Sequence, residues 1–110
     1  MRISVCHCLD CQRRSGSAFS AQARFPDAAV TITGAARTWR KIGDSGGVAE
    51  FGFCPDCGST VFYRIDAMPG LVAVPIGAFA NPSFPTPAFS VYENRKHAWV
   101  EIAAEGLIHD

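Results

Sequence analysis

The stretch FSAQARF, residues 19–25, decides the fold class because apolar and polar residues alternate along it without a break. In an extended chain, successive side chains point to opposite faces, so a period of two is typical of a β-strand. The stretch therefore predicts a strand with one face of Phe and Ala residues and one polar face. The polar face consists of Ser20, Gln22 and Arg24.

Similar short stretches, rich in aromatic and β-branched residues, predict further strands. They cover residues 29–33, 36–42, 48–53, 59–65, 71–76 and 98–103. Turn-forming residues separate them at close intervals, at Pro26-Asp27, Gly34, residues 44–47, Pro69-Gly70 and Asn81-Pro82. Short strands with regular turns predict an all-β fold of mainly antiparallel sheets.

One short helix is expected close to the first cysteines. LDCQRRSG, residues 9–16, is long enough for one or two helical turns that end at Gly16. Residues 81–87 contain three prolines and predict a loop or an extended arm. A chain of 110 residues has room for one hydrophobic core, so we expect a single domain over residues 1–110.

Composition narrows the function classes. The formal charge is zero, which argues against nucleic acid and acidic membranes as partners. A group of basic residues is most simply explained as solvated surface; it consists of Arg13, Arg14, Arg37, Arg40 and Lys41. No segment approaches the roughly 20 apolar residues of a membrane span, and the N-terminus lacks an apolar signal region. We therefore expect a cytoplasmic protein whose five cysteines stay reduced.

The motif CPDCG, residues 54–58, places two thiols where they can hold a metal ion or form a redox pair. A thioredoxin-like redox pair has its first cysteine at the start of a helix. Here the residues that follow, 59–65, predict a strand instead. The motif therefore favours a metal-binding knuckle, in which Pro55 stiffens the turn and Gly58 permits a left-handed exit.

The first cluster, Cys6-x-Cys8-x-x-Cys11, allows two groupings. In one, Cys8 and Cys11 join Cys54 and Cys57 in a four-cysteine zinc ribbon, and Cys6 is left over. In the other, all three cysteines of the cluster hold one zinc ion, and three protein ligands with an open fourth position are typical of catalytic zinc. The first grouping describes a non-catalytic binding module, and the second describes an enzyme.

Zinc with three thiolate ligands is electron-rich, so it suits holding a substrate thiol as its thiolate better than activating water. Arg13 and Arg14 follow the last ligand and are candidates for binding the carboxylates of such a substrate, although single arginines also fit solvated surface. His7 lies between two ligands and is expected to point away from them. His97 and His109 belong to no motif and are expected at the surface.

Two motifs give the chain a family resemblance. Residues 6–16 match C-H-C-x-x-C-x-x-x-S-G, residues 54–58 match C-x-x-C-G, and Trp99 follows a proline-rich segment. With these motifs the chain resembles, over nearly its whole length, the glutathione-dependent formaldehyde-activating enzyme family. This family is also described as the S-(hydroxymethyl)glutathione synthase-like or GFA/CENP-V-type domain.

The resemblance implies an all-β fold of the Mss4-like, or β-tent, type. It implies a carbon–sulfur lyase whose partners are a small thiol such as glutathione and a small aldehyde such as formaldehyde. It also implies a catalytic zinc at Cys6, Cys8 and Cys11, and a structural zinc for which Cys54 and Cys57 supply two ligands.

The chain departs from the family in one respect. Members usually carry an upstream C-x-C-G segment that supplies the other two structural ligands, whereas only five residues precede Cys6 here. We expect either a truncated start or a lineage that lost this strand. A structural zinc at Cys54 and Cys57 would then be weakly held. The lost strand would expose a sheet edge, which favours homodimerisation or aggregation.

Overall fold

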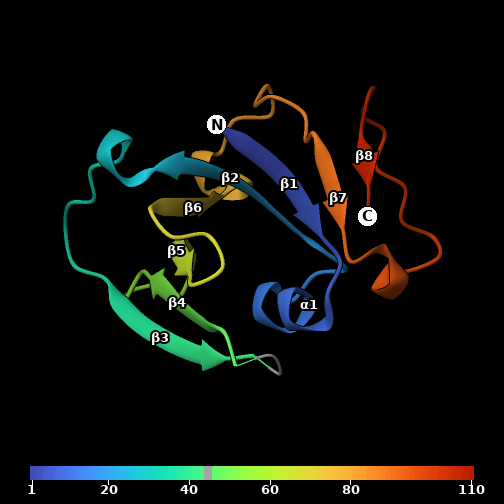
Figure 1. The fold of residues 1–110 in the computed structure, drawn as a ribbon. Coiled ribbons are helices and arrows are strands. Elements are labelled where there is room, and N and C mark those ends of the chain that lie inside the picture. The colour runs from blue at the N-terminus through green and yellow to red at the C-terminus, as the bar shows by residue number, and fades with distance from the viewer. Residues whose placement is uncertain (44–45) are drawn as a thin grey trace.

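The computed structural model describes residues 1–43 and 46–110, which form one eight-stranded sheet, one α-helix and three short 3-10 helices (Figure 1). The strands are β1 (Arg2–Cys6), β2 (Ser20–Pro26), β3 (Arg37–Ile42), β4 (Val48–Phe53), β5 (Thr60–Ile65), β6 (Leu71–Pro75), β7 (Phe89–Val91) and β8 (Ile108–His109). The helices are α1 (Leu9–Ser15), η1 (Asp27–Ala29), η2 (Ile76–Phe79) and η3 (Glu93–Arg95). Across the sheet the strand order is β3-β4-β5-β6-β2-β1-β7-β8.

The predicted all-β class is confirmed, but the sheet is mixed and not purely antiparallel. From β3 to β1 all neighbours are antiparallel, whereas β7 runs parallel to both β1 and β8. The chain reaches β7 from β6 through residues 76–88, a connection long enough for it to return beside β1 in the parallel direction. The sheet is therefore mainly antiparallel, as predicted, and parallel pairing occurs at this end of it.

The strand of residues 19–25 is confirmed as β2, and four other predicted strands are present within one residue of their expected bounds, as β3, β4, β5 and β6. Residues 29–33 and 98–103 form no strand. Their β-branched and aromatic composition does not make a strand without a neighbour to pair with. β1, β7 and β8 were not predicted; β7 and β8 have three and two residues, too few to show an alternation. Part of the predicted turn at residues 44–47 lies outside the described residues.

The predicted short helix is confirmed as α1. Cys8 is its N-cap residue, and Gly16 ends it in the left-handed conformation with φ 67°. The N–H of Gly16 donates to the carbonyl of Gln12, which satisfies one of the last helical carbonyls. Residues 81–87 form an irregular segment, as their prolines predict.

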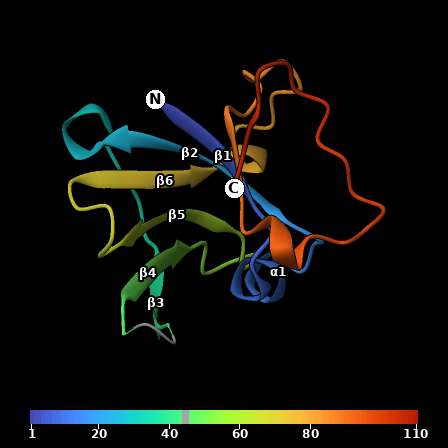
Figure 2. The same ribbon diagram turned by 45° about the vertical axis from the view of Figure 1, so that its right-hand side comes forward.

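The sheet is strongly curved, and α1 lies on its inner side near the ends of β1 and β2 (Figures 1 and 2). One face of β1 and β2 is apolar and contributes buried Ile3, Val5 and Ala23 to the core. The opposite face of the same strands is polar, and it carries the residues of the candidate site. Within residues 1–43 and 46–110, no helix has the length and the apolar character needed to cross a membrane.

Candidate metal centre and cavity

Three thiols converge where β1 ends and α1 begins. Cys6 is the last residue of β1, Cys8 caps α1, and Cys11 lies in the first turn of that helix. Their sulfur atoms all lie within 4.8 Å of one another, and they form the one such group of three or more metal-binding side chains among the described residues. Cys6 is buried, and the other two are half-buried.

The donor set fits a zinc ion. A Zn–S bond of about 2.3 Å in a tetrahedral site separates the sulfurs by about 3.8 Å, which this group reaches with a small contraction. The backbone N–H of Cys11 donates to the sulfur of Cys8 over 3.3 Å, so the N-cap contact of α1 holds this sulfur in place. With that contraction, the three cysteines can hold a metal ion.

Each of these thiols affects the ionisation of its neighbours through hydrogen bonds. Hydrogen bonds from Cys6 and Cys8 lower the pKa of Cys11, because they stabilise its thiolate. The same contact with Cys11, together with burial, raises the pKa of Cys6. Three sulfur atoms that stabilise a thiolate among them are a soft donor set, and such a set suits zinc.

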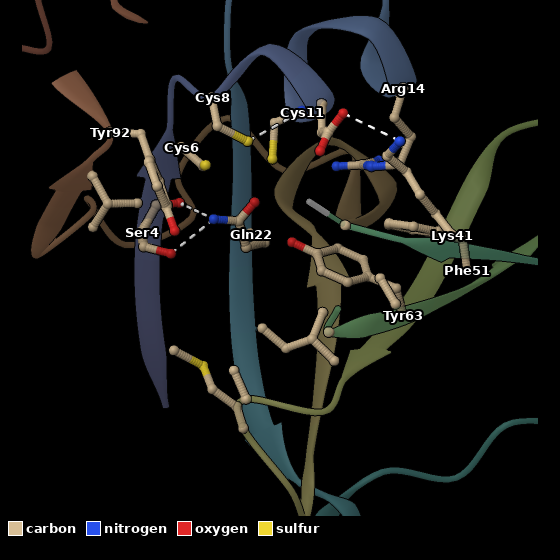
Figure 3. Close-up of a pocket in the computed structure, with 18 of the residues that line it drawn as sticks. Ser4, Cys6, Cys8, Cys11, Arg14, Gln22, Lys41, Phe51, Tyr63 and Tyr92 are labelled. Carbon is tan, nitrogen blue, oxygen red and sulfur yellow. Dashed lines mark hydrogen bonds and ion pairs between the residues drawn. The ribbon is translucent and has the colours of Figure 1, made fainter. Parts of the chain in front are cut away.

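A cavity of about 870 Å³ lies beside the thiols, and all three of them line it (Figure 3). Every second residue of β1 faces the cavity, namely Arg2, Ser4 and Cys6. The register with β2 places Arg24 opposite Arg2 and Gln22 opposite Ser4, and both β2 residues line the same cavity. Of the polar face predicted for residues 19–25, Gln22 and Arg24 therefore line a cavity, and Ser20 is buried.

The polar groups beside the thiols are held by a hydrogen-bond network. The amide nitrogen of Gln22 donates to Ser4 at the hydroxyl (2.7 Å) and at the carbonyl (3.1 Å). The Ser20 hydroxyl donates to the carbonyl oxygen of the Gln22 side chain over 2.9 Å. The Gln22 side chain is thereby fixed next to Cys6 and Cys11 (Figure 3).

Tyr63 of β5 forms part of the opposite wall, and its phenol oxygen points into the cavity (Figure 3). Its ring packs against Phe51, with ring centroids 5.1 Å apart. Burial raises the pKa of the phenol above its ordinary value, so the group stays protonated at neutral pH. Tyr63 is therefore a hydrogen-bond donor inside the cavity.

The two predicted arginines have different positions. The guanidinium of Arg14 lies 4.9 Å from the ring centroid of Phe51 and 5.1 Å from that of Tyr63, at the cavity wall. Arg13 lies outside the cavity lining, pairs with Asp10 over 3.2 Å, and its side chain is 71% exposed. The structure therefore brings Arg14, and not Arg13, to the thiols.

His7 points away from the thiols, as its place between two of them predicts. Its ring is completely buried, and burial lowers its pKa. Nε2 of His7 lies 3.0 Å from the Ser90 hydroxyl, which itself donates to Glu93 over 2.7 Å. His97 and His109 are exposed, as expected.

Cys54 and Cys57 lie in the turn between β4 and β5 and do not belong to the group of three thiols. Gly58 leaves the turn with φ 79°, as the motif predicts. The hydroxyl of Ser59, 3.3 Å from the sulfur of Cys57, lowers the pKa of that thiol. The strand that follows, β5, confirms that this pair does not precede a helix.

Several polar residues that share the cavity with the cysteines were not predicted as site residues, among them Arg2, Ser4, Gln22, Arg24 and Tyr63. The position of Ser4 could have been predicted from RISVC, residues 2–6, where every second residue is polar or a cysteine. That alternation would have placed Ser4 on the same strand face as Cys6. No local pattern points to Tyr63, which comes from a distant strand.

The comparisons with known proteins agree with the motifs. The family model described as glutathione-dependent formaldehyde-activating enzyme matches residues 1–95. A search among curated proteins gives no match.

Proposed function

The chain belongs to the glutathione-dependent formaldehyde-activating enzyme family, and from this premise we propose that it is a zinc-dependent carbon–sulfur lyase acting on a thiol–aldehyde adduct. By family membership, the thiol is glutathione and the aldehyde is formaldehyde. The observation that carries the proposal is the convergence of Cys6, Cys8 and Cys11 at a cavity that holds protonated and cationic groups. Such a cavity suits a substrate that has both a thiol and carboxylates.

Cys6, Cys8 and Cys11 are the proposed zinc ligands. Zinc at this position would hold a substrate thiol in its nucleophilic thiolate form. Three protein ligands leave one position for the substrate, which enters from the cavity that all three cysteines line.

The addition of the thiol to the aldehyde needs no third reactant. A carbon–sulfur bond forms, the π bond of the aldehyde carbonyl breaks, and the proton lost by the thiol ends on the new hydroxyl oxygen. Negative charge develops on that oxygen, so a donor aimed at it lowers the barrier. The phenol of Tyr63 is the donor that we assign to this role, because it faces the cavity and stays protonated.

Arg14 is the proposed contact for a carboxylate of the thiol substrate, because its guanidinium lies at the cavity wall. Among the described residues, Arg14 forms no ion pair that would compete with this contact. Arg13 is left out of this role because it faces solvent beside Asp10. For Cys54 and Cys57 we propose a structural part in metal binding, separate from the reaction.

The test is zinc content and adduct formation in three proteins: the unaltered chain, Cys6→Ala and Cys54→Ala. We expect Cys6→Ala to lose the catalytic zinc and Cys54→Ala to keep it. We also expect the unaltered chain to accelerate the formation of the adduct from formaldehyde and glutathione, and NMR measures this rate. A ribbon made by Cys8, Cys11, Cys54 and Cys57 would give the reverse pattern of zinc loss, and absence of any acceleration would overturn the proposed reaction.

A further inference from the structure

Gln12 of α1 uses its whole side-chain amide in contacts with other parts of the chain. Its amide nitrogen donates to the carbonyl of His7 over 2.8 Å and to the carbonyl of Arg95 over 3.1 Å. Its amide oxygen lies 2.9 Å from Nε2 of His97. Because that oxygen can only accept, His97 donates to it, and the orientation of the amide is fixed.

The residue that Gln12 holds, His7, lies between the first two of the three thiols. The backbone N–H of His7 donates to the carbonyl of Val91 over 3.1 Å, and its ring lies 3.0 Å from the Ser90 hydroxyl. These partners belong to the segment around η3, which lies beside α1 (Figure 2). Gln12 completes the set, so the backbone between the two thiols is fixed at its N–H and at its carbonyl.

The third thiol depends on the same side chain, because Cys11 precedes Gln12 in α1. This helix has seven residues, and none of them is fully buried. A helix of this length is not stable by itself in water, so contacts with the rest of the protein have to hold it. Gln12 connects the helix to the backbone between the other two thiols and to residues 95–97 at once.

We propose that Gln12 is a positioning residue that holds the three thiols ready for zinc, and that His97 orients Gln12 for this role. The inference rests on the zinc site of the proposed function. Thiolates repel one another until the metal binds, so a backbone that keeps them together raises the affinity for the metal.

Neither residue belongs to the motifs of the family. Residue 12 is one of the unspecified positions in the motif that residues 6–16 match. His97 lies outside residues 1–95, which the family model matches. The contact between Gln12 and His97 is therefore a property of this fold that the cysteine spacing does not reveal.

The test measures the Kd of zinc by competition with a chelator, for the unaltered chain, Gln12→Met and Arg13→Met. Methionine matches glutamine in length and in helix propensity but has no N–H to donate. In Gln12→Met we expect the Kd of zinc to rise by about 10-fold or more, as is typical when a group that orients metal ligands is lost. Arg13→Met is the matched control on the same helix, since Arg13 is exposed and lies outside the cavity lining, and its Kd should stay unchanged.

His97→Phe is the second variant, and it leaves α1 itself unaltered. Phenylalanine keeps a ring beside Trp99, whose centroid lies 5.5 Å from that of His97, but it removes the Nε2 donor. We expect the Kd of zinc to rise in this variant too. Added to Gln12→Met, the same substitution should cause no further rise, because both residues act through one amide. Additive effects would overturn the role of His97.

A melt of the metal-free chains separates positioning from a merely structural role. If Gln12→Met melts at a lower temperature but binds zinc as tightly as the unaltered chain, the inference is overturned, and an equal loss of zinc affinity in Arg13→Met overturns it as well. Zinc affinity is measured without substrates, so it is independent of the proposed reaction. If the Kd of zinc depends on Gln12 while no adduct forms from formaldehyde and glutathione, the inference stands and the proposed reaction fails.

Discussion

The hydroxyl of Ser90 lies 3.0 Å from Nε2 of His7, although 83 residues separate the two in sequence. The proton of Ser90 is directed at Glu93, so His7 donates and Ser90 accepts. His109 then donates to Glu93 over 2.9 Å. This chain of polar groups connects the segment that carries Cys6 and Cys8 to the end of the sheet.

Replacing Ser90 by alanine should destabilise the protein by about 1–3 kcal/mol, because Nε2 of His7 would be left buried without a partner. Nδ1 of the same ring is already buried and unpartnered among the described residues, so the ring has no other polar contact to compensate. The free energy of unfolding in urea is the measurement. Ser83→Ala, at an exposed site, should change it by less than about 0.5 kcal/mol, and equal effects of the two substitutions would contradict this prediction.

Glu93 should make stability depend on pH. The hydrogen bonds from His109 and Ser90 hold the pKa of this carboxyl below its ordinary value of about 4.3 in the folded protein. The unfolded chain therefore binds its proton first as the pH falls. The contribution of Glu93 is fully present above about pH 4.3 and is lost as the pH falls through the folded pKa.

The measurement is the free energy of unfolding between about pH 3 and pH 7, for the unaltered chain and for Glu93→Gln. The variant should show a smaller loss of stability in the acidic range. Glu101→Gln, at an exposed position, serves as the control. Superimposable pH profiles for the unaltered chain and Glu93→Gln would show that this carboxyl plays no such part.

Tyr63→Phe should lower kcat for adduct formation by about 100-fold, the loss typical of removing one donor from a developing oxyanion. The ring that packs against Phe51 is retained, so the melting temperature should hardly change. NMR rates with formaldehyde and glutathione, together with a thermal melt, check both halves of the prediction. An unaltered rate in a folded variant would remove Tyr63 from the proposed chemistry.

Gly52→Ala should destabilise the fold by about 1–3 kcal/mol through overpacking. Gly52 of β4 is paired with Phe62 of β5, and an added Cβ would overlap the Phe62 ring. Gly77→Ala is the matched control, because a Cβ there meets no atom within 4 Å. Urea unfolding should separate the two, and a Gly52→Ala variant as stable as Gly77→Ala would show that the Phe62 ring moves aside at no cost.

Much of the fold was predictable from local patterns. The alternation in residues 19–25 placed β2 correctly and assigned Ser20, Gln22 and Arg24 to one face, because the side-chain period of a strand is a property of the backbone itself. The three thiols were predictable for a similar reason. Cys6, Cys8 and Cys11 fall within six residues, where a strand end and the first helical turn keep them close.

Other predictions failed where the outcome depended on distant partners. Residues 29–33 have the composition of a strand but form none, and β7 has a weak pattern but pairs with β1 and β8. Composition indicates how well a residue suits a sheet, whereas pairing depends on which strands the chain brings together.

By itself, the sequence determined the thiol cluster, the polar face of β2 and the short helix α1, since each of these follows from backbone geometry over a few residues. Only the tertiary structure decided that Gln22 and Arg24 of this face line a cavity, that Tyr63 lines it too, and that of the two predicted arginines Arg14 and not Arg13 stands at its wall. It also placed Arg2 opposite Arg24, which lies far along the chain. These relationships depend on strand register and sheet curvature, and both are set by contacts between residues distant in sequence.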